Sequence, residues 1–256
     1  MKRISMSATS RRMLSVSVLT LCVALLGPIF RGADAATMSY GSFGPVPPGV
    51  SFLNVEESSG TDPVPLYGAP TAFSIGLDFD PRLFVATSSG GGADLTDGQL
   101  NFTVRSGVGI ASLGLFERGD YTLAGVGTAA TEVQAGAIIL ATVTAINGIP
   151  VPPINLFPVN ASVSFDLPNN AGITQPWSLG IGLNVAAQLG AGQAATRIDV
   201  VIDNALVATS ERQSTAFIAK KDFIFRVEVV PEPSSIVLAG LFLCGLGAIA
   251  ARKRPC

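Results

Sequence analysis

The middle of the chain alternates apolar and polar residues with a period of two, and this alternation favours β-strands. Residues 222–229 show it most clearly: every second residue from Phe223 and Phe225 onward is apolar, whereas Arg226 and Glu228 lie between them. Successive side chains of a strand point to opposite faces of its sheet. The run therefore predicts a strand with one buried face and one polar face.

Comparable short runs recur through residues 36–229, with clusters of Gly, Asn, Asp and Ser between them. The runs lie at 50–55, 71–80, 99–105, 108–116, 121–124, 137–146, 161–165, 179–185, 197–202 and 205–208. The clusters lie at 88–92, 96–98, 117–120, 169–172 and 203–204. Gly and Asn accept the positive φ that tight hairpins need. The pattern predicts an all-β body of about ten short antiparallel strands, arranged as a β-sandwich or jelly roll.

A cluster of prolines at 150–158 interrupts this series of strands. It predicts either a linker between two domains or a crossover within one. We favour the crossover, because each half alone has too few strands to cover its own core.

The N-terminal segment has the three parts of a secretory signal peptide. Four basic residues precede an apolar run at 13–30, and Ala33-Asp34-Ala35 follows. The small side chains of Ala33 and Ala35 suit the pocket of a signal peptidase. We expect residues 1–35 to be removed by cleavage after Ala35. An uncleaved membrane helix is the alternative, and Arg11-Arg12 leaves general secretion or twin-arginine export open.

The C-terminal segment, 230–256, also has three parts. Pro231-Glu232-Pro233 precedes an apolar run at 235–251, and Arg252-Lys253-Arg254 follows. The run reaches the lower limit for a transmembrane helix. The basic cluster should stay on the cytoplasmic side, which places the body outside.

This tail resembles the PEP-CTERM sorting signal of exported bacterial proteins, which an exosortase recognises and processes. The resemblance implies that Pro231, Glu232 and Pro233 form the recognition motif. It also implies that the helix and Arg252, Lys253 and Arg254 retain the chain in the membrane, transiently or permanently. A plain membrane anchor with a proline-rich stalk is the alternative.

Parts of the body, at 117–123, 125–129 and 219–223, also look like uncharacterised exported proteins with the same tail. That likeness implies no particular activity.

Charge and composition exclude several classes of function. Eight of the 16 basic residues but only two of the 18 acidic ones lie in the terminal segments, which leaves the body at about −8. Such a body has no electrostatic attraction for nucleic acid. The chain has no histidine, and its three cysteines all lie in the terminal segments. Catalytic triads and His-ligated metal sites are therefore excluded, and we expect no cofactor and no enzyme activity.

Three residues of the body remain as weak ligand candidates. Trp177, the only tryptophan, could stack on a sugar, although a core position is the more common use of a single tryptophan. Asp94 and Asp97, in an acidic segment with a glycine, could bind calcium, although the spacing is not that of an EF-hand.

These observations predict an exported protein of the cell envelope, cell surface or extracellular matrix. Its partners would be a signal peptidase, an exosortase-type enzyme, the membrane and an exopolysaccharide of a biofilm. A carbohydrate-binding module is the alternative, and a glycosidase that uses a carboxylate pair is a third possibility.

Overall fold

The computed structural model describes residues 36–47 and 49–230. The predicted cleavage site at Ala33 and Ala35, the Pro231-Glu232-Pro233 motif, the helix at 235–251 and the basic cluster all lie outside these residues. Within the described residues, no helix has the length and apolar character needed to cross a membrane.

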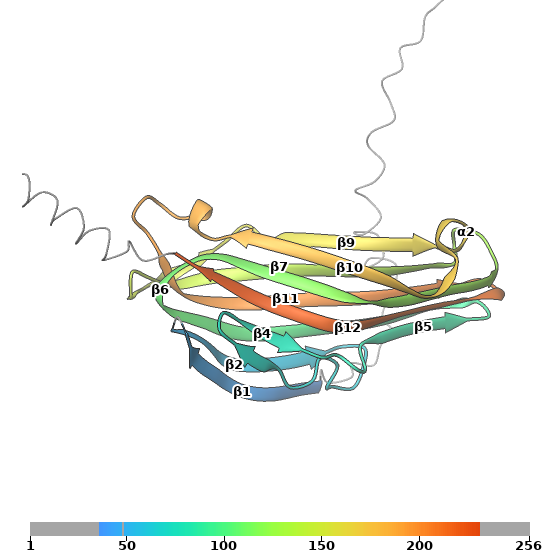
Figure 1. Cartoon of the computed structure of the whole chain (residues 1–256), viewed down its shortest axis with the longest axis horizontal. Helices are drawn as coiled ribbons and strands as arrows, with labels where there is room; N and C mark the ends of the chain where they lie inside the picture. The colour runs from blue at the N-terminus through green and yellow to red at the C-terminus, as the bar shows by residue number, and fades with distance from the viewer. Residues whose placement is uncertain (1–35, 48, 231–256) are drawn as a thin grey trace, which may run out of the picture. The chain divides into compact units, whose positions relative to one another are not determined.

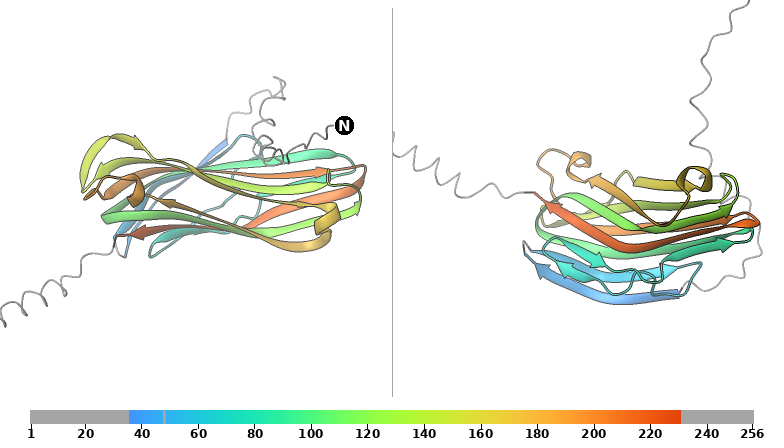
Figure 2. Two further views of the ribbon diagram at one scale, coloured as in Figure 1. Left: turned by 90° about the horizontal axis from the view of Figure 1, so that it is seen from above. Right: turned by 45° about the vertical axis from the view of Figure 1, so that its right-hand side comes forward.

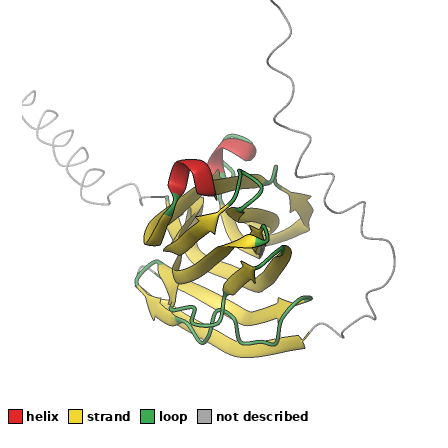
Figure 3. Cartoon of the chain, turned by 90° about the vertical axis from the view of Figure 1, so that its right-hand side faces the viewer, coloured by secondary structure: helices red, strands yellow, loops and turns green. Residues whose placement is uncertain are grey.

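The described part of the chain is an all-β body, as the alternation predicted. Its strands are β1 (Ala36–Val46), β2 (Val50–Ser59), β3 (Thr71–Phe73), β4 (Gly76–Phe79), β5 (Val85–Ser89), β6 (Gly92–Val126), β7 (Glu132–Ile146), β8 (Ile149–Asn155), β9 (Val159–Asp166), β10 (Gly172–Asn184), β11 (Ala195–Ser210) and β12 (Gln213–Val229). Two short helices, α2 (Leu167–Asn170) and η1 (Ala186–Gln188), interrupt them. Figure 3 shows the strands in stacked layers with both helices, drawn in red, at one side.

All twelve strands belong to one antiparallel sheet, in which β6 connects two groups of strands. The first half of β6 pairs with β11 and β2, and β11 continues to β7, which carries β8 and β9. The second half pairs with β10 and β12, and β12 carries β4 and β5. The arrangement is consistent with a β-sandwich (Figures 1 and 2).

The change of partners along β6 is visible in the burial of its side chains. Even-numbered residues such as Leu100 and Val104 are buried in its first half, whereas odd-numbered ones such as Leu113 and Leu115 are buried in its second half. A strand side chain changes face only where the alternation is interrupted. The register shifts near Ile110 lie at this interruption, where β6 leaves one group of strands and enters the other.

Three predicted turns, at 96–98, 117–120 and 203–204, are wrong: the first two lie inside β6 and the third inside β11. Each contains a polar side chain that forms a hydrogen bond or ion pair with a residue distant in the sequence. Thr61 donates its backbone N–H to Asp97 Oδ1 at 3.0 Å, and Lys220 lies between Glu117 and Asn204. The strands are consequently longer than predicted, and β6 alone has 35 residues.

The core lies between the inward faces of these strands and is rich in aromatic rings. Phe52, Phe102 and Phe225 pack edge to face, with ring centroids 4.9 to 6.3 Å apart. The predicted alternation at 223–229 is confirmed, because Phe223, Phe225 and Val227 are fully buried and Arg226 and Glu228 are exposed.

The proline-rich stretch at 150–158 forms β8 and the segment leading to β9. Both strands pair with β7, β8 along its C-terminal half and β9 along its N-terminal half. Proline lacks a backbone N–H, so within sheets it is found at edges, where one side of the strand needs no partner.

Candidate functional site

The outer side of the sheet around β6 carries an aromatic ring among polar side chains. Phe116 is 42% exposed. In register with it lie Gly180 of β10 on one side and Ile224 of β12 on the other. We call this surface the Phe116 face, and its members are Ser112, Gly114, Phe116, Arg118, Gly180, Gly182, Asp222, Ile224, Arg226, Glu228 and Asp78 of β4.

The glycines of the Phe116 face leave a shallow hollow beside the ring. A Cβ at Gly182 would meet no heavy atom within 4 Å, and a Cβ at Gly114 or Gly180 would meet only one carbonyl oxygen at 4.0 Å. Larger side chains would fit at all three positions, and one at Gly114, which lines the hollow, would fill it. Its walls include Ile75, Ser112, Phe116, Ile181, Ile224, Arg226 and Glu228.

Donors and acceptors of hydrogen bonds border the hollow on one side. Ser112 donates its hydroxyl hydrogen to Glu228 Oε2 at 2.7 Å. The guanidinium of Arg226 lies 5.8 Å from the centroid of the Phe73 ring. This contact holds a cation beside the hollow, and Arg226 as a whole is exposed.

A charged pair lies on the same face, on the other side of Phe116. Arg118 Nη2 lies 2.5 Å from Asp222 Oδ2. Asp78 lies close by, and burial raises its pKa above the usual value, with the negative charges of Asp222 and Asp80 adding to the effect. The face therefore offers charges of both signs around one exposed ring.

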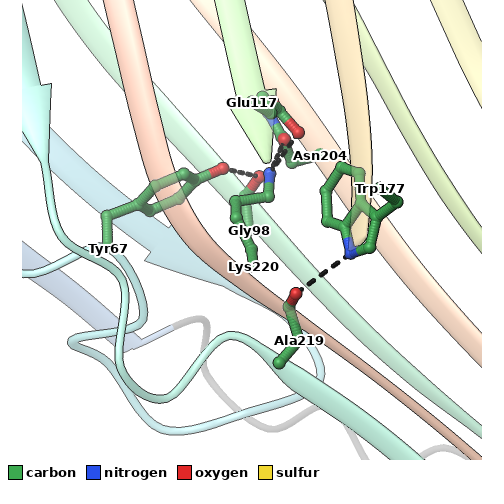
Figure 4. A network of polar contacts seen from close by, with 7 residues as sticks. All are labelled: Tyr67, Gly98, Glu117, Trp177, Asn204, Ala219 and Lys220. Carbon is green, nitrogen blue, oxygen red and sulfur yellow. Dashed lines mark hydrogen bonds and ion pairs between the residues drawn. The ribbon is translucent and has the colours of Figure 1, made fainter. Parts of the chain in front are cut away.

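A buried polar cluster lies on the core side of the same strands (Figure 4). Glu117 of β6, Lys220 of β12 and Asn204 of β11 are 0 to 1% exposed. Lys220 Nζ lies 2.8 Å from Glu117 Oε2 and donates a hydrogen bond to Asn204 Oδ1. Tyr67 donates its hydroxyl hydrogen to the carbonyl of Gly98 at 2.9 Å nearby.

Trp177, the predicted sugar contact, is a core residue. Only 3% of it is exposed, and its Nε1–H donates to the carbonyl of Ala219 at 3.1 Å. Gly119 makes this packing possible, because a Cβ there would lie 1.8 Å from that carbonyl oxygen and 2.8 Å from the indole nitrogen. The ring has no free face for a ligand, so the ligand role is not supported.

Asp94 and Asp97, the weak calcium candidates, are separate. Their odd spacing on β6 directs them to opposite faces of the strand. Asp94 accepts a hydrogen bond from the backbone N–H of Thr87 at 2.7 Å. Asp97 accepts from Ser59, Gly60 and Thr61 at 2.8 to 3.1 Å. Residues 36–47 and 49–230 contain no group of three or more potential metal-binding side chains.

The two distant segments singled out in the sequence, 117–120 and 219–223, lie side by side on β6 and β12. Their charges form three ion pairs: Glu117–Lys220, Arg118–Asp222 and Asp120–Lys221. The sequence analysis missed the Phe116 face and the buried cluster. The available signal was Leu115-Phe116, where two adjacent apolar residues break the alternation and one must point outward.

Comparisons with known proteins give little that bears on function. No protein-family model matches the chain, and no curated protein matches it. A solved structure of TmCBM61 in complex with β-1,4-galactotriose is 11% identical in sequence, over 77% of this chain and 90% of that chain, with a TM-score of 0.25. At that level the match identifies neither the fold nor a ligand of this chain.

Proposed function

We propose that this chain is an exported, non-enzymatic protein of the cell surface or extracellular matrix, whose body binds a polysaccharide through the Phe116 face. The terminal sequences support export, and an exosortase-type enzyme would process the tail at Pro231, Glu232 and Pro233. The observation that carries the binding proposal is the exposed Phe116 ring beside a hollow whose walls are both apolar and polar.

Each part of the face has a use in holding a sugar chain. An aromatic ring packs against the C–H groups of a pyranose, and Ile224 extends that apolar surface. Ser112, Arg226 and Glu228 supply both donors and acceptors, which hydroxyl groups require. The glycines keep the surface low, so that a chain could lie across β10, β6 and β12.

The binding proposal is tested with the purified mature protein on a panel of soluble polysaccharides, by affinity electrophoresis or calorimetry. We expect Phe116→Ser to weaken binding about tenfold or more, because the stacking surface is lost. Gly114→Gln should also weaken it by filling the hollow, because a Cβ there would meet only one carbonyl oxygen, at 4.0 Å.

Phe157→Ser is the matched control, because Phe157 is 81% exposed and lies outside the Phe116 face. This control should bind as the unmodified protein does. Binding to no polysaccharide, or equal binding by Phe116→Ser and Phe157→Ser, would contradict the proposed site. Hydrolysis of a bound polysaccharide would contradict the non-enzymatic part.

Export and sorting are tested separately in the host. Mass spectrometry of the chain from the envelope and medium should find an N-terminus at Ala36 and a C-terminus altered near Pro231. Replacing Glu232 by alanine should block the C-terminal processing. An intact chain in the cytosol would reject this part and leave the glycan test unaffected.

A further inference from the structure

The buried cluster brings together three side chains from three different strands. Lys220 of β12 places its Nζ 2.8 Å from Glu117 Oε2 of β6. The same Nζ contacts Oδ1 of Asn204, which lies on β11 in the other group of strands. An amine, a carboxamide and a carboxyl group therefore meet at one point in the core (Figure 4).

The surroundings of the three groups are apolar. Lys220 Nζ lies 4.5, 5.3 and 5.6 Å from the ring centroids of Phe84, Phe223 and Tyr67. Burial lowers the pKa of Lys220 and raises the pKa of Glu117, although their mutual attraction opposes both shifts. Burial thus favours moving a proton from the ammonium to the carboxylate, which gives an uncharged amine and a carboxylic acid.

The carboxamide of Asn204 has an unpaired donor. Its Nδ2 group is buried and makes no hydrogen bond of regular geometry within the described residues. Asn204 nevertheless lies close enough to Glu117 to help lower the pKa of that carboxyl group. A buried donor without a good acceptor is costly. Loss of the Nδ2 group as ammonia would remove that cost.

We propose that Lys220 and Asn204 become joined by an intramolecular amide bond, with Glu117 as the catalytic residue. The unprotonated Nζ attacks Cγ of Asn204 while the Glu117 acid donates a hydrogen bond to Oδ1 and polarises the carbonyl. Glu117 then transfers a proton from Nζ to Nδ2. The Cγ–Nδ2 bond breaks and ammonia leaves. One C–N bond forms, one breaks, nothing is oxidised, and Glu117 returns to its starting state.

The place of the bond in the fold gives it a structural role. It would join β11 to β12, and so link the two groups of strands that β6 connects. The body has no cysteine with which to form a disulfide, because the three cysteines lie at positions 22, 244 and 256. An amide cross-link would supply covalent stabilisation that withstands reduction.

The test is tryptic peptide mapping of the purified full chain, which is independent of how its ends are processed. The bond predicts a branched peptide in which 198–212 and 213–221 remain joined through Lys220 and Asn204, with a mass about 17 Da below the sum of the two. Trypsin should not cut after Lys220. Separate peptides that show free Lys220 and intact Asn204 in the unmodified chain would overturn the proposal.

Three variants and a control assign the chemistry. Lys220→Arg, Asn204→Ala and the near-isosteric Glu117→Gln should each abolish the branched peptide. Lys221→Arg should retain it, since Lys221 is the exposed neighbour on the same strand. Asn204 could also lose about 17 Da by closing on its own backbone as a succinimide. In that case the loss of about 17 Da would lie in a linear peptide 198–212, and finding it there in the unmodified chain without a branched peptide would contradict the cross-link.

Discussion

Strands β6 and β12 carry two kinds of ion pair within a few residues of each other. Glu117 and Lys220 are 0 and 1% exposed and face the core, among aromatic rings. Arg118 pairs with Asp222 on the outer face, where the arginine side chain is 64% exposed. The Asp222 side chain is only 11% exposed, so both carboxylates are largely buried and the contrast isolates the burial of the cation.

A single irregularity in β12 produces both environments. The pairing of β12 with β6 shifts between Lys220 and Asp222, so that Lys221 is an extra residue in the strand. Lys220 and Phe223 are buried and Lys221 is exposed, while Asp222 lies in register with Arg118 of the outer face although it is only 8% exposed. A β-bulge changes which residues face the core. Here it buries one lysine and exposes the next.

The largest expected effect comes from removing the buried lysine side chain. Lys220→Met should lower the free energy of unfolding by about 3–5 kcal/mol, because Glu117 is left in the core without its partner. Urea denaturation followed by fluorescence of Trp177 measures the change. Lys221→Met is the control, and it should cost less than about 1 kcal/mol because that lysine is mostly exposed. Equal costs would show that burial of the lysine does not separate the Glu117–Lys220 pair from the Asp120–Lys221 pair.

The next largest effect separates a covalent link from an ordinary buried pair. Replacing Glu117 by leucine, Lys220 by methionine and Asn204 by leucine removes every polar group of the cluster. For a non-covalent pair this exchange is often neutral or stabilising. If a cross-link closes the chain over the 16-residue separation, its loss should cost about 3 kcal/mol by loop-closure entropy. If urea denaturation gives the triple variant a free energy of unfolding no lower than that of the original chain, the cross-link is contradicted.

Much of the fold follows from local alternation, and most of the sites do not. The apolar runs at 99–105, 137–146 and 197–202 all lie in strands, because period-two burial is a local property. The turn prediction at 117–120 failed because Glu117 gains its partner from a residue about 100 positions away. The Phe116 face was missed because the bend in β6 and the bulge in β12 decide which residues point outward, and pairing between distant strands sets both.

A smaller effect on stability is expected at Gly119, which follows Glu117 and Arg118 on β6. Gly119→Ala should destabilise the body by about 1–3 kcal/mol, because the new Cβ would overlap the Ala219 carbonyl and displace Trp177. The melting temperature followed by circular dichroism measures it. Gly182→Ala is the matched control in the neighbouring strand, where a Cβ meets nothing within 4 Å. A similar loss in both variants would mean that glycine is needed for strand geometry and not for the Trp177 contact.

The smallest expected effect is a pH dependence of stability that arises from Glu211, in the turn between β11 and β12. The pKa of this exposed carboxyl group is lowered, whereas the pKa of buried Glu117 is raised. A hydrogen bond from the backbone N–H of Thr128 holds the pKa of Glu211 below its usual 4.5, and the Thr131 hydroxyl adds to the shift. A carboxyl group with a lowered pKa in the folded state stabilises that state above its unfolded pKa. This contribution is lost as the pH falls through the lower folded value. Unfolding by urea from pH 7 to pH 3 should therefore show a stability difference between the original chain and Glu211→Gln that is constant near neutrality and shrinks below about pH 4.5. Burial raises the pKa of Glu117, so protonation of that group on acidification favours the folded state and increases its stability. A stability difference that grows on acidification would mean that the contacts of Glu211 do not favour its ionised form.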